Sequence, residues 1–129
     1  MKKSNALTAI RGKYKPQYPA KYAGNLNRIT YRSMWERRFM LYCDRSHQIK
    51  KWSSEELHIP YYFEEDDKWH NYYPDFVVVT EDDRTIVVEI KPHFQKGYKK
   101  NKAKWKAARA YCKSFGYEFK VMTEKELFE

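Results

Sequence analysis

The sequence predicts an α/β fold in which helices flank a mixed β-sheet. Segments 75–79 and 85–91 are rich in valine and isoleucine, which is typical of central strands. An amphipathic helical pattern precedes these strands, and a second one follows them before a further strand at 117–122. The order helix, antiparallel strands, helix, strand is that of a layered α/β domain with a mixed sheet.

Residues 1–30 are predicted to form an arm, and residues 31–129 a single domain. The arm carries seven basic residues and no acidic residue, whereas the rest of the chain is almost balanced within a total net charge of +9. Pro16, Pro19 and Gly24 interrupt any helix in the arm. A basic arm on a near-neutral body indicates a polyanionic partner such as nucleic acid, with a solubilising tail as the alternative.

The first elements after the arm are a helix and two strands. Ser33 is predicted to cap a helix that ends near Arg45 or Ser46, because apolar residues recur at helical spacing along it. Segments 51–53 and 57–63 are predicted strands, and Pro60 places the second at an edge or a bend.

Two acidic turns separate the strands that follow. Residues 64–67 form the first turn, and a strand is predicted to return over 69–79. Residues 81–83 form the second turn, which leads into the strand at 85–91.

The last part of the chain is predicted to be helix, strand and short helix. Asn101 is the expected N-cap of the long helix, and Gly116 is its expected C-terminal stop. A strand at 117–122 follows, and residues 123–126 have the pattern of a capping box that opens a short helix.

Composition excludes membrane and disulfide-stabilised classes of protein. No apolar run approaches the length that spans a bilayer, and the first residues are too polar for a signal-peptide core. A protein that is not secreted and has no membrane partner is therefore expected. Cys43 and Cys112 both fall in helical patterns, which favours buried free thiols over a disulfide.

Three charged residues stand at the ends of the two most apolar strands. Asp75 opens one strand, while Glu89 and Lys91 lie two residues apart on the next and so share a sheet face. A carboxylate entering a buried hairpin is costly to desolvate unless a cation compensates its charge. If Asp75 lies near Glu89, the pair could bind one Mg²⁺, or two about 4 Å apart.

In that arrangement Lys91 would hold or deprotonate an attacking water and stabilise charge on a phosphate. The alternative is a surface ion pair between Glu89 and Lys91. Asp75 would then only cap a turn after Pro74.

Glu36 is a candidate for a further metal ligand. It lies at helical spacing with Met40 and Cys43, so it falls on the inward face of its helix and could reach the same site. It is also the third residue after Ser33, and the alternative is that it only completes a capping box.

This pattern resembles the PD-(D/E)XK nuclease superfamily, through Pro74-Asp75, Glu89-x-Lys91 and the helical Glu36. The likeness is closer still to the T-even-type phage head-completion nucleases, with kinship to TnsA-like endonucleases. The stretches that carry it are Tyr31-Arg32-Ser33-x-Trp35-Glu36, Trp52-x-Ser54-Glu55, Ile59-Pro60-Tyr61, Tyr73-Pro74-Asp75-Phe76 and Val88-Glu89-Ile90-Lys91-Pro92.

The resemblance implies a restriction-endonuclease-like core and a metal-dependent deoxyribonuclease. Asp75, Glu89, the Ile90 carbonyl and sometimes Glu36 would ligate Mg²⁺, with Mn²⁺ as an expected substitute. Lys91 would assist the water, and cleavage would leave a 5′-phosphate.

The resemblance also implies a place of action. The enzyme would cut or trim packaged phage DNA during head completion, with DNA and phage head or portal proteins as partners, in the host cytoplasm or the virion. Because one small domain has one active site, a double-strand cut would require a homodimer or two encounters. A structural or DNA-binding adaptor and a junction or transposon-end nuclease stay open as alternatives.

Basic residues in three places are the predicted DNA contacts. They are Lys13, Tyr14, Lys15 and Lys21 of the arm, Lys96, Lys99 and Lys100 after the strand at 85–91, and Lys102, Lys106 and Arg109 on the second helix. Lysines can neutralise phosphates while tyrosines stack on exposed bases. The alternatives are that the tyrosines dock the arm on the body and that the helix stripe is only a solvated face.

Overall fold

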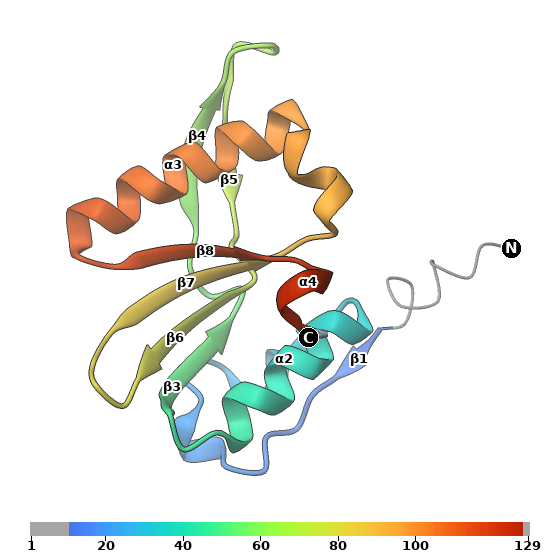
Figure 1. Ribbon diagram of the computed structural model, residues 1–129, viewed down its shortest axis with the longest axis vertical. Coiled ribbons are helices and arrows are strands. Elements are labelled where there is room, and N and C mark those ends of the chain that lie inside the picture. The colour runs from blue at the N-terminus through green and yellow to red at the C-terminus, as the bar shows by residue number, and fades with distance from the viewer. Residues whose placement is uncertain (1–10, 128–129) are drawn as a thin grey trace, which may run out of the picture.

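The computed structural model describes residues 11–127, in which a mixed sheet lies between two long helices (Figure 1). The strand order in the sheet is β3 (Ile49–Ser54), β6 (Phe76–Thr80), β7 (Thr85–Ile90) and β8 (Glu118–Met122). The first three strands pair antiparallel, and β8 pairs parallel with β7 because a helix carries the chain back between them. The predicted α/β fold class with a mixed sheet is confirmed.

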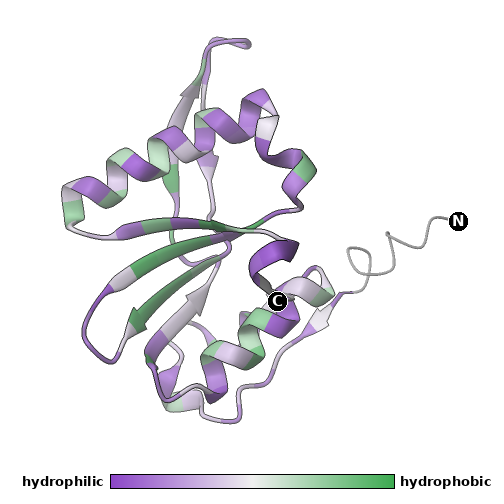
Figure 2. Ribbon diagram, in the orientation of Figure 1, coloured by the Kyte–Doolittle hydropathy of each residue, from purple (hydrophilic) through white to green (hydrophobic). Residues whose placement is uncertain are grey.

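Each long helix covers one face of this sheet. Helix α2 (Met34–Arg45) packs on the face that Val88 and Ile90 present. Helix α3 (Lys99–Phe115) packs on the other face, where Trp105 meets Val121. The two faces separate because successive side chains of a strand point in opposite directions. Figure 2 shows β6 and β7 as the most apolar strands of the sheet, which agrees with their central position.

One predicted strand is in fact two. The segment 69–79 splits into β5 (Lys68–Tyr72) and β6, which belong to different sheets. Pro74 lies at the break, because a proline has no N–H to donate to a strand ladder. β5 pairs instead with β4 (Ile59–Phe63) in a separate hairpin, which projects past α3 (Figure 1). The inward side chains of this hairpin pack on Trp105.

The predicted helix termini are confirmed at three places. The Ser33 hydroxyl accepts a hydrogen bond from the Glu36 amide, 3.1 Å away, and α2 begins at the next residue after Ser33. Gly116 ends α3 with φ of +74°, a left-handed conformation that glycine adopts without strain. Before α4 (Glu124–Leu127), the Glu126 carboxylate accepts from the Thr123 amide at 2.6 Å, as in a capping box.

Asn101 is not the N-cap of α3, contrary to the prediction. The helix begins two residues earlier, at Lys99, and its cap residue Tyr98 provides no side-chain hydrogen bond. Asn101 is buried instead, and its amide nitrogen donates to the Gln95 carbonyl at 2.9 Å. Its side chain therefore fixes the loop before the helix rather than the helix terminus.

The described part of the arm packs on the domain. A short strand β1 (Gly12–Lys13) pairs with β2 (Thr30–Tyr31). Tyr14 and Tyr22 then enter the core beside Trp52, with ring centroids 5.9 and 4.7 Å from its ring. For these two tyrosines the structure therefore shows the alternative reading, in which they dock the arm on the domain. Two short 3₁₀ helices, Pro19–Lys21 and Leu26–Arg28, lie in the same stretch.

A buried aspartate of α2 anchors this stretch. The Asp44 carboxylate, which is 0% exposed, accepts hydrogen bonds from the Tyr14 hydroxyl at 2.7 Å, the Gln17 amide at 2.7 Å and the Tyr18 amide at 3.0 Å. A buried carboxylate needs such donors because it has left water. Residues 1–10, the rest of the predicted arm, lie outside the described residues.

Two smaller predictions concern the class of protein. Cys43 and Cys112 are free and buried, as predicted. Within residues 11–127, no helix combines the length and the apolar character needed to cross a bilayer.

Candidate active site

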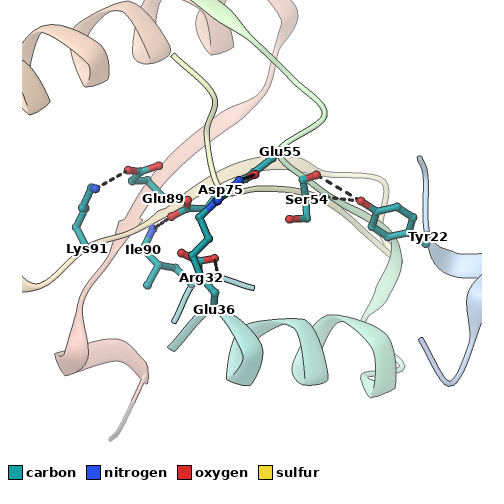
Figure 3. Close-up of polar contacts among 9 residues, drawn as sticks. All are labelled: Tyr22, Arg32, Glu36, Ser54, Glu55, Asp75, Glu89, Ile90 and Lys91. Carbon is teal, nitrogen blue, oxygen red and sulfur yellow. Dashed lines mark hydrogen bonds and ion pairs between the residues drawn. The ribbon is translucent and has the colours of Figure 1, made fainter. Parts of the chain in front are cut away.

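The β6–β7 hairpin brings the two predicted carboxylates together at one end of the sheet. Its register pairs Phe76 with Val88, so that Asp75 and Glu89 come opposite each other one step further along. The Asp75 carboxylate accepts a hydrogen bond from the Ile90 amide at 2.7 Å (Figure 3). Asp75 is thereby held against the strand that carries Glu89.

Lys91 lies beside the same carboxylates. Its ammonium nitrogen is 3.7 Å from a Glu89 carboxylate oxygen, because the two residues project from the same side of the chain (Figure 3). The Lys91 side chain is 29% exposed and that of Glu89 only 4%, so the lysine forms the boundary between the buried acid and solvent. Ile90, between them, directs its side chain into the core on the α2 side.

Glu89 is a buried acid with specific partners. The Tyr72 hydroxyl donates a hydrogen bond to its other carboxylate oxygen at 2.8 Å. Burial raises the pKa of Glu89, while the nearby Lys91 charge and the Tyr72 hydrogen bond act in the opposite direction. Burial and the Glu89 charge raise the pKa of Tyr72, which keeps its hydroxyl protonated as a donor.

Glu36 contributes both to the helix cap and to the charge of the site. Its carboxylate accepts a hydrogen bond from the Arg32 amide at 2.9 Å, one residue before the cap Ser33 (Figure 3). Burial raises the pKa of Glu36, and the negative charges of Glu55 and Glu89 raise it further. The capping role of Glu36 is therefore compatible with a place near the acidic cluster.

The Asp75 carboxylate is repelled by the negative charges of the other two acids. Burial raises its pKa well above the usual range, and the charges of Glu89 and Glu36 add to this effect. The Ile90 amide and the Lys91 charge offset only part of it. Three carboxylates that repel one another at one end of a sheet form a site that a cation would stabilise.

The donor set fits a hard divalent cation. Mg²⁺ prefers oxygen ligands and is usually held by one or two carboxylates, with water and substrate phosphates completing its shell. Within the described residues, no group of three or more acidic, histidine or cysteine side chains is arranged to hold a metal. Glu36, Asp75 and Glu89 are thus not arranged as a complete three-carboxylate metal site, and the pair that could bind Mg²⁺ is Asp75 and Glu89, which lie opposite each other in the β6–β7 register. The Ile90 carbonyl and Glu36 are candidate additional ligands.

Sequence reasoning missed two residues of this site. Tyr72 ends β5, and its ring lies 5.7 Å from the ammonium of Lys104 on α3. Lys104 is half-buried, and its pKa is lowered by burial and by the nearby Lys91. The signal for Lys104 was its position four residues before the inward-facing Ala108, which puts both on one face of the helix.

A bidentate ion pair borders the site. The Arg32 guanidinium donates two hydrogen bonds of 2.9 Å to the Glu55 carboxylate (Figure 3). Glu55 follows β3 with φ of +55°, and its amide donates to the Asp75 carbonyl at 3.1 Å. The pair thus links the chain before α2 to the loop that carries Asp75.

The predicted DNA contacts on α3 and the preceding loop are exposed. They are Lys96, Lys99, Lys100, Lys102, Lys106 and Arg109. Lys99 lies 3.4 Å from the Glu65 carboxylate, and Lys100 stands 5.9 Å from the Phe63 ring. Their role in DNA binding stays a prediction.

The predicted contacts in the arm have different surroundings. Lys13 and Lys15 are exposed. The Lys21 ammonium donates to the Asp44 and Ser46 carbonyls at 2.8 and 2.9 Å, and so caps the C-terminal end of α2. Tyr14 is 7% exposed and faces the core, which leaves no ring surface for a base. The prediction that Tyr14 contacts DNA is corrected accordingly.

Comparison with known proteins connects this geometry with nucleases. Residues 46–124 match the family model described as the TnsA-like endonuclease N terminal, a stretch that includes Asp75, Glu89 and Lys91. The chain is also 31% identical to the head completion nuclease of Enterobacteria phage T4, over 92% of this chain and 94% of that protein.

Proposed function

Because the chain belongs to the family of TnsA-like endonuclease N-terminal domains, and is therefore a nuclease, we propose that it is a Mg²⁺-dependent enzyme that cuts or trims packaged DNA during phage head completion. The observation that carries the chemistry is the convergence of Asp75, Glu89 and Lys91 at one end of the sheet. The head-completion role follows from the similarity to the phage T4 nuclease. Head or portal proteins are then the expected partners, and the host cytoplasm or the virion the expected place.

Each residue of the site has a proposed role in hydrolysis. Asp75 and Glu89 would hold Mg²⁺, with the Ile90 carbonyl and Glu36 as further ligands. When bound, the ion would stabilise negative charge on the scissile phosphate and favour ionisation of a water. Lys91, at the boundary between Glu89 and solvent, would donate a hydrogen bond to the attacking water or to a phosphate oxygen and orient it.

Two neighbours would support this chemistry. The Tyr72 hydroxyl holds the Glu89 carboxylate in one orientation, so the ligand need not reorganise when the substrate arrives. Lys104 adds a second positive charge near Lys91, where it would attract the DNA backbone. Cleavage would leave a 5′-phosphate on one strand per engagement, so a double-strand cut would need a homodimer or a second encounter.

Lys91→Ala is expected to lower the rate of plasmid nicking by about 10²- to 10⁴-fold, the usual contribution of a positioned proton-transfer group. Supercoiled plasmid is incubated with wild-type protein in MgCl₂, MnCl₂ or EDTA, and nicked and linear products are measured on gels. Lys120→Ala, which removes an exposed lysine of β8, is the matched control and should cut normally. Nicking that persists in Lys91→Ala or in EDTA would refute the proposed site. DNA binding without any cleavage by the wild type would favour the adaptor alternative.

Metal-free protein is expected to lose stability as the pH rises. The pKa values of Glu36, Asp75 and Glu89 are raised, so the folded state favours their protonated forms. That stabilisation is complete below the ordinary carboxyl range near about pH 4 and is lost as the pH rises through the raised values. Mg²⁺ should offset the loss by binding the ionised carboxylates.

Differential scanning fluorimetry in EDTA and in MgCl₂ would measure this effect. Glu36→Gln should raise the metal-free Tm at pH 8 by about 2–5 °C, with a smaller gain at pH 5. Glu81→Gln, in an exposed turn, controls for the loss of a carboxylate elsewhere. A gain that is equal at both pH values, together with no response to Mg²⁺, would contradict a carboxylate cluster that binds metal.

A further inference from the structure

A pair of exposed aromatic rings follows the candidate active site closely along the chain. Phe94 is 70% exposed and Tyr98 52% exposed, and their rings meet edge to face with centroids 6.4 Å apart. Both belong to the segment around the 3₁₀ helix η3 (His93–Gly97), which directly follows β7 and Lys91. A phenylalanine ring has no polar group with which to bind water, so a ligand that covers it gains free energy.

The short stretch of chain between Lys91 and Phe94 limits how far the aromatic pair can lie from the lysine. Phe94 is three residues from Lys91, so their Cα atoms are at most about 11 Å apart. A stacked DNA strand advances about 3.4 Å per nucleotide. Both side chains extend several Å beyond their Cα atoms, so a base on Phe94 would belong to a nucleotide only a few positions from the bond that Lys91 serves.

The segment that holds the rings is anchored. At its start, the His93 amide donates to the Glu124 carboxylate at 2.9 Å. In its middle, the Gln95 carbonyl accepts from the buried Asn101 side chain at 2.9 Å. Fixed aromatic groups bind a planar ligand at a lower entropic cost than mobile ones.

The charge around the pair favours a polyanion. Lys96, Lys99 and Lys100 lie in the same segment and are exposed. No acidic residue occurs in residues 90–117, and two carboxylates from elsewhere reach the segment, Glu124 at the His93 amide and Glu65 at 3.4 Å from Lys99. Aromatic rings among cations are typical of surfaces that bind single-stranded nucleic acid, where bases stack on the rings and lysines contact phosphates.

We propose that Phe94 and Tyr98 form a stacking site for unpaired DNA bases beside the scissile phosphate. Bases inside a duplex already stack on their neighbours, so only a frayed end, a flap or a single-stranded segment can offer a free base to the ring. The site would therefore make the enzyme prefer DNA that is unpaired near the cut. This inference rests on the proposed nuclease function and names the form of its substrate.

Binding can be measured apart from cleavage, in EDTA. The probes are a blunt duplex and the same duplex with a single-stranded flap that carries 2-aminopurine, whose fluorescence falls on stacking. Wild-type protein should bind the flap more tightly and quench the probe. Phe94→Ala should weaken flap binding about 10-fold and abolish quenching while leaving duplex binding unchanged.

Three further variants show whether the effect depends on an aromatic ring at this place. Phe94→Trp keeps a stacking ring and should retain both affinity and quenching, and Tyr98→Leu should reduce them. Phe115→Ala removes another exposed ring, 57% exposed at the far end of α3, and should have no effect. Circular dichroism checks that each variant is folded. Equal flap binding by Phe94→Ala and wild type, or equal losses on flap and duplex, would overturn the inference.

Cleavage of the same two substrates in MgCl₂ separates this inference from the proposed function. If the wild type cuts DNA and Phe94→Ala keeps its flap preference, the stacking site is refuted and the nuclease stands. If the wild type does not cut but its quenching depends on Phe94, the metal-dependent function is refuted and the stacking site stands.

Discussion

Replacing Asp75 with asparagine is expected to lower DNA cleavage by about 10³-fold or more, while folding and DNA binding are retained. An asparagine oxygen can still accept the hydrogen bond that the Ile90 amide now donates to Asp75. The variant therefore keeps the local geometry and loses only the negative charge that a divalent cation requires. Loss of that charge also relieves repulsion with Glu89 and Glu36, so the metal-free Tm should rise.

The combination of lower activity and higher Tm distinguishes a lost ligand from damaged structure. Plasmid nicking measures the activity, and scanning fluorimetry in EDTA at pH 8 measures the Tm. The wild-type Tm should respond to Mg²⁺, and the Tm of the variant should not. Asp67→Asn, in the exposed turn between β4 and β5, is the matched control. Normal nicking by Asp75→Asn would remove Asp75 from the site, and a fall in both activity and Tm would point to a structural role.

The largest effect on stability is expected at Asp44. Asp44→Ala removes the acceptor of the Tyr14 hydroxyl and of the Gln17 and Tyr18 amides. A buried donor left without a partner, such as the Tyr14 hydroxyl, costs about 1–3 kcal/mol, and the part-buried Gln17 and Tyr18 amides cost less each because water can reach them. A total loss of about 3–5 kcal/mol is therefore expected. This is a large part of the roughly 5–15 kcal/mol that stabilises a typical domain.

Urea unfolding followed by tryptophan fluorescence would measure the loss, because Trp52 lies against Tyr14 in the core. Tyr14→Phe deletes one of the three hydrogen bonds and should cost only about 1 kcal/mol. Trypsin should also cut Asp44→Ala faster within residues 11–28, since the basic residues there are held on the domain through Asp44. If Asp44→Ala were as stable as wild type, the arm would not depend on this anchor.

Patterns that extend over only a few residues were sufficient to predict several features of this protein. Alternation along a strand placed Glu89 and Lys91 on one side of the chain, and the structure shows their contact. The cap at Ser33 and the stop at Gly116 depend on single residues and their own dihedral angles, so they were predictable. The family could also be recognised from motifs spaced along the chain, and the comparisons confirm it.

Other features depend on residues that are distant in the sequence. Tyr72 reaches Glu89 only because the chain breaks at Pro74 and sends β5 into a separate hairpin. Lys104 joins them from α3, the helix that covers the Glu89 side of the sheet, through packing that no short pattern encodes.

The amino-acid sequence by itself thus determined the fold class, the family and the spacing of the candidate acids and lysine. Those properties arise from backbone periodicity and single-residue preferences, which act over a few residues. Only the tertiary structure decided that the described part of the arm is docked through Asp44 and that Tyr72 and Lys104 surround Glu89. The physical reason is that burial, hydrogen bonding and charge repulsion act through space, and the chain must fold before those partners meet.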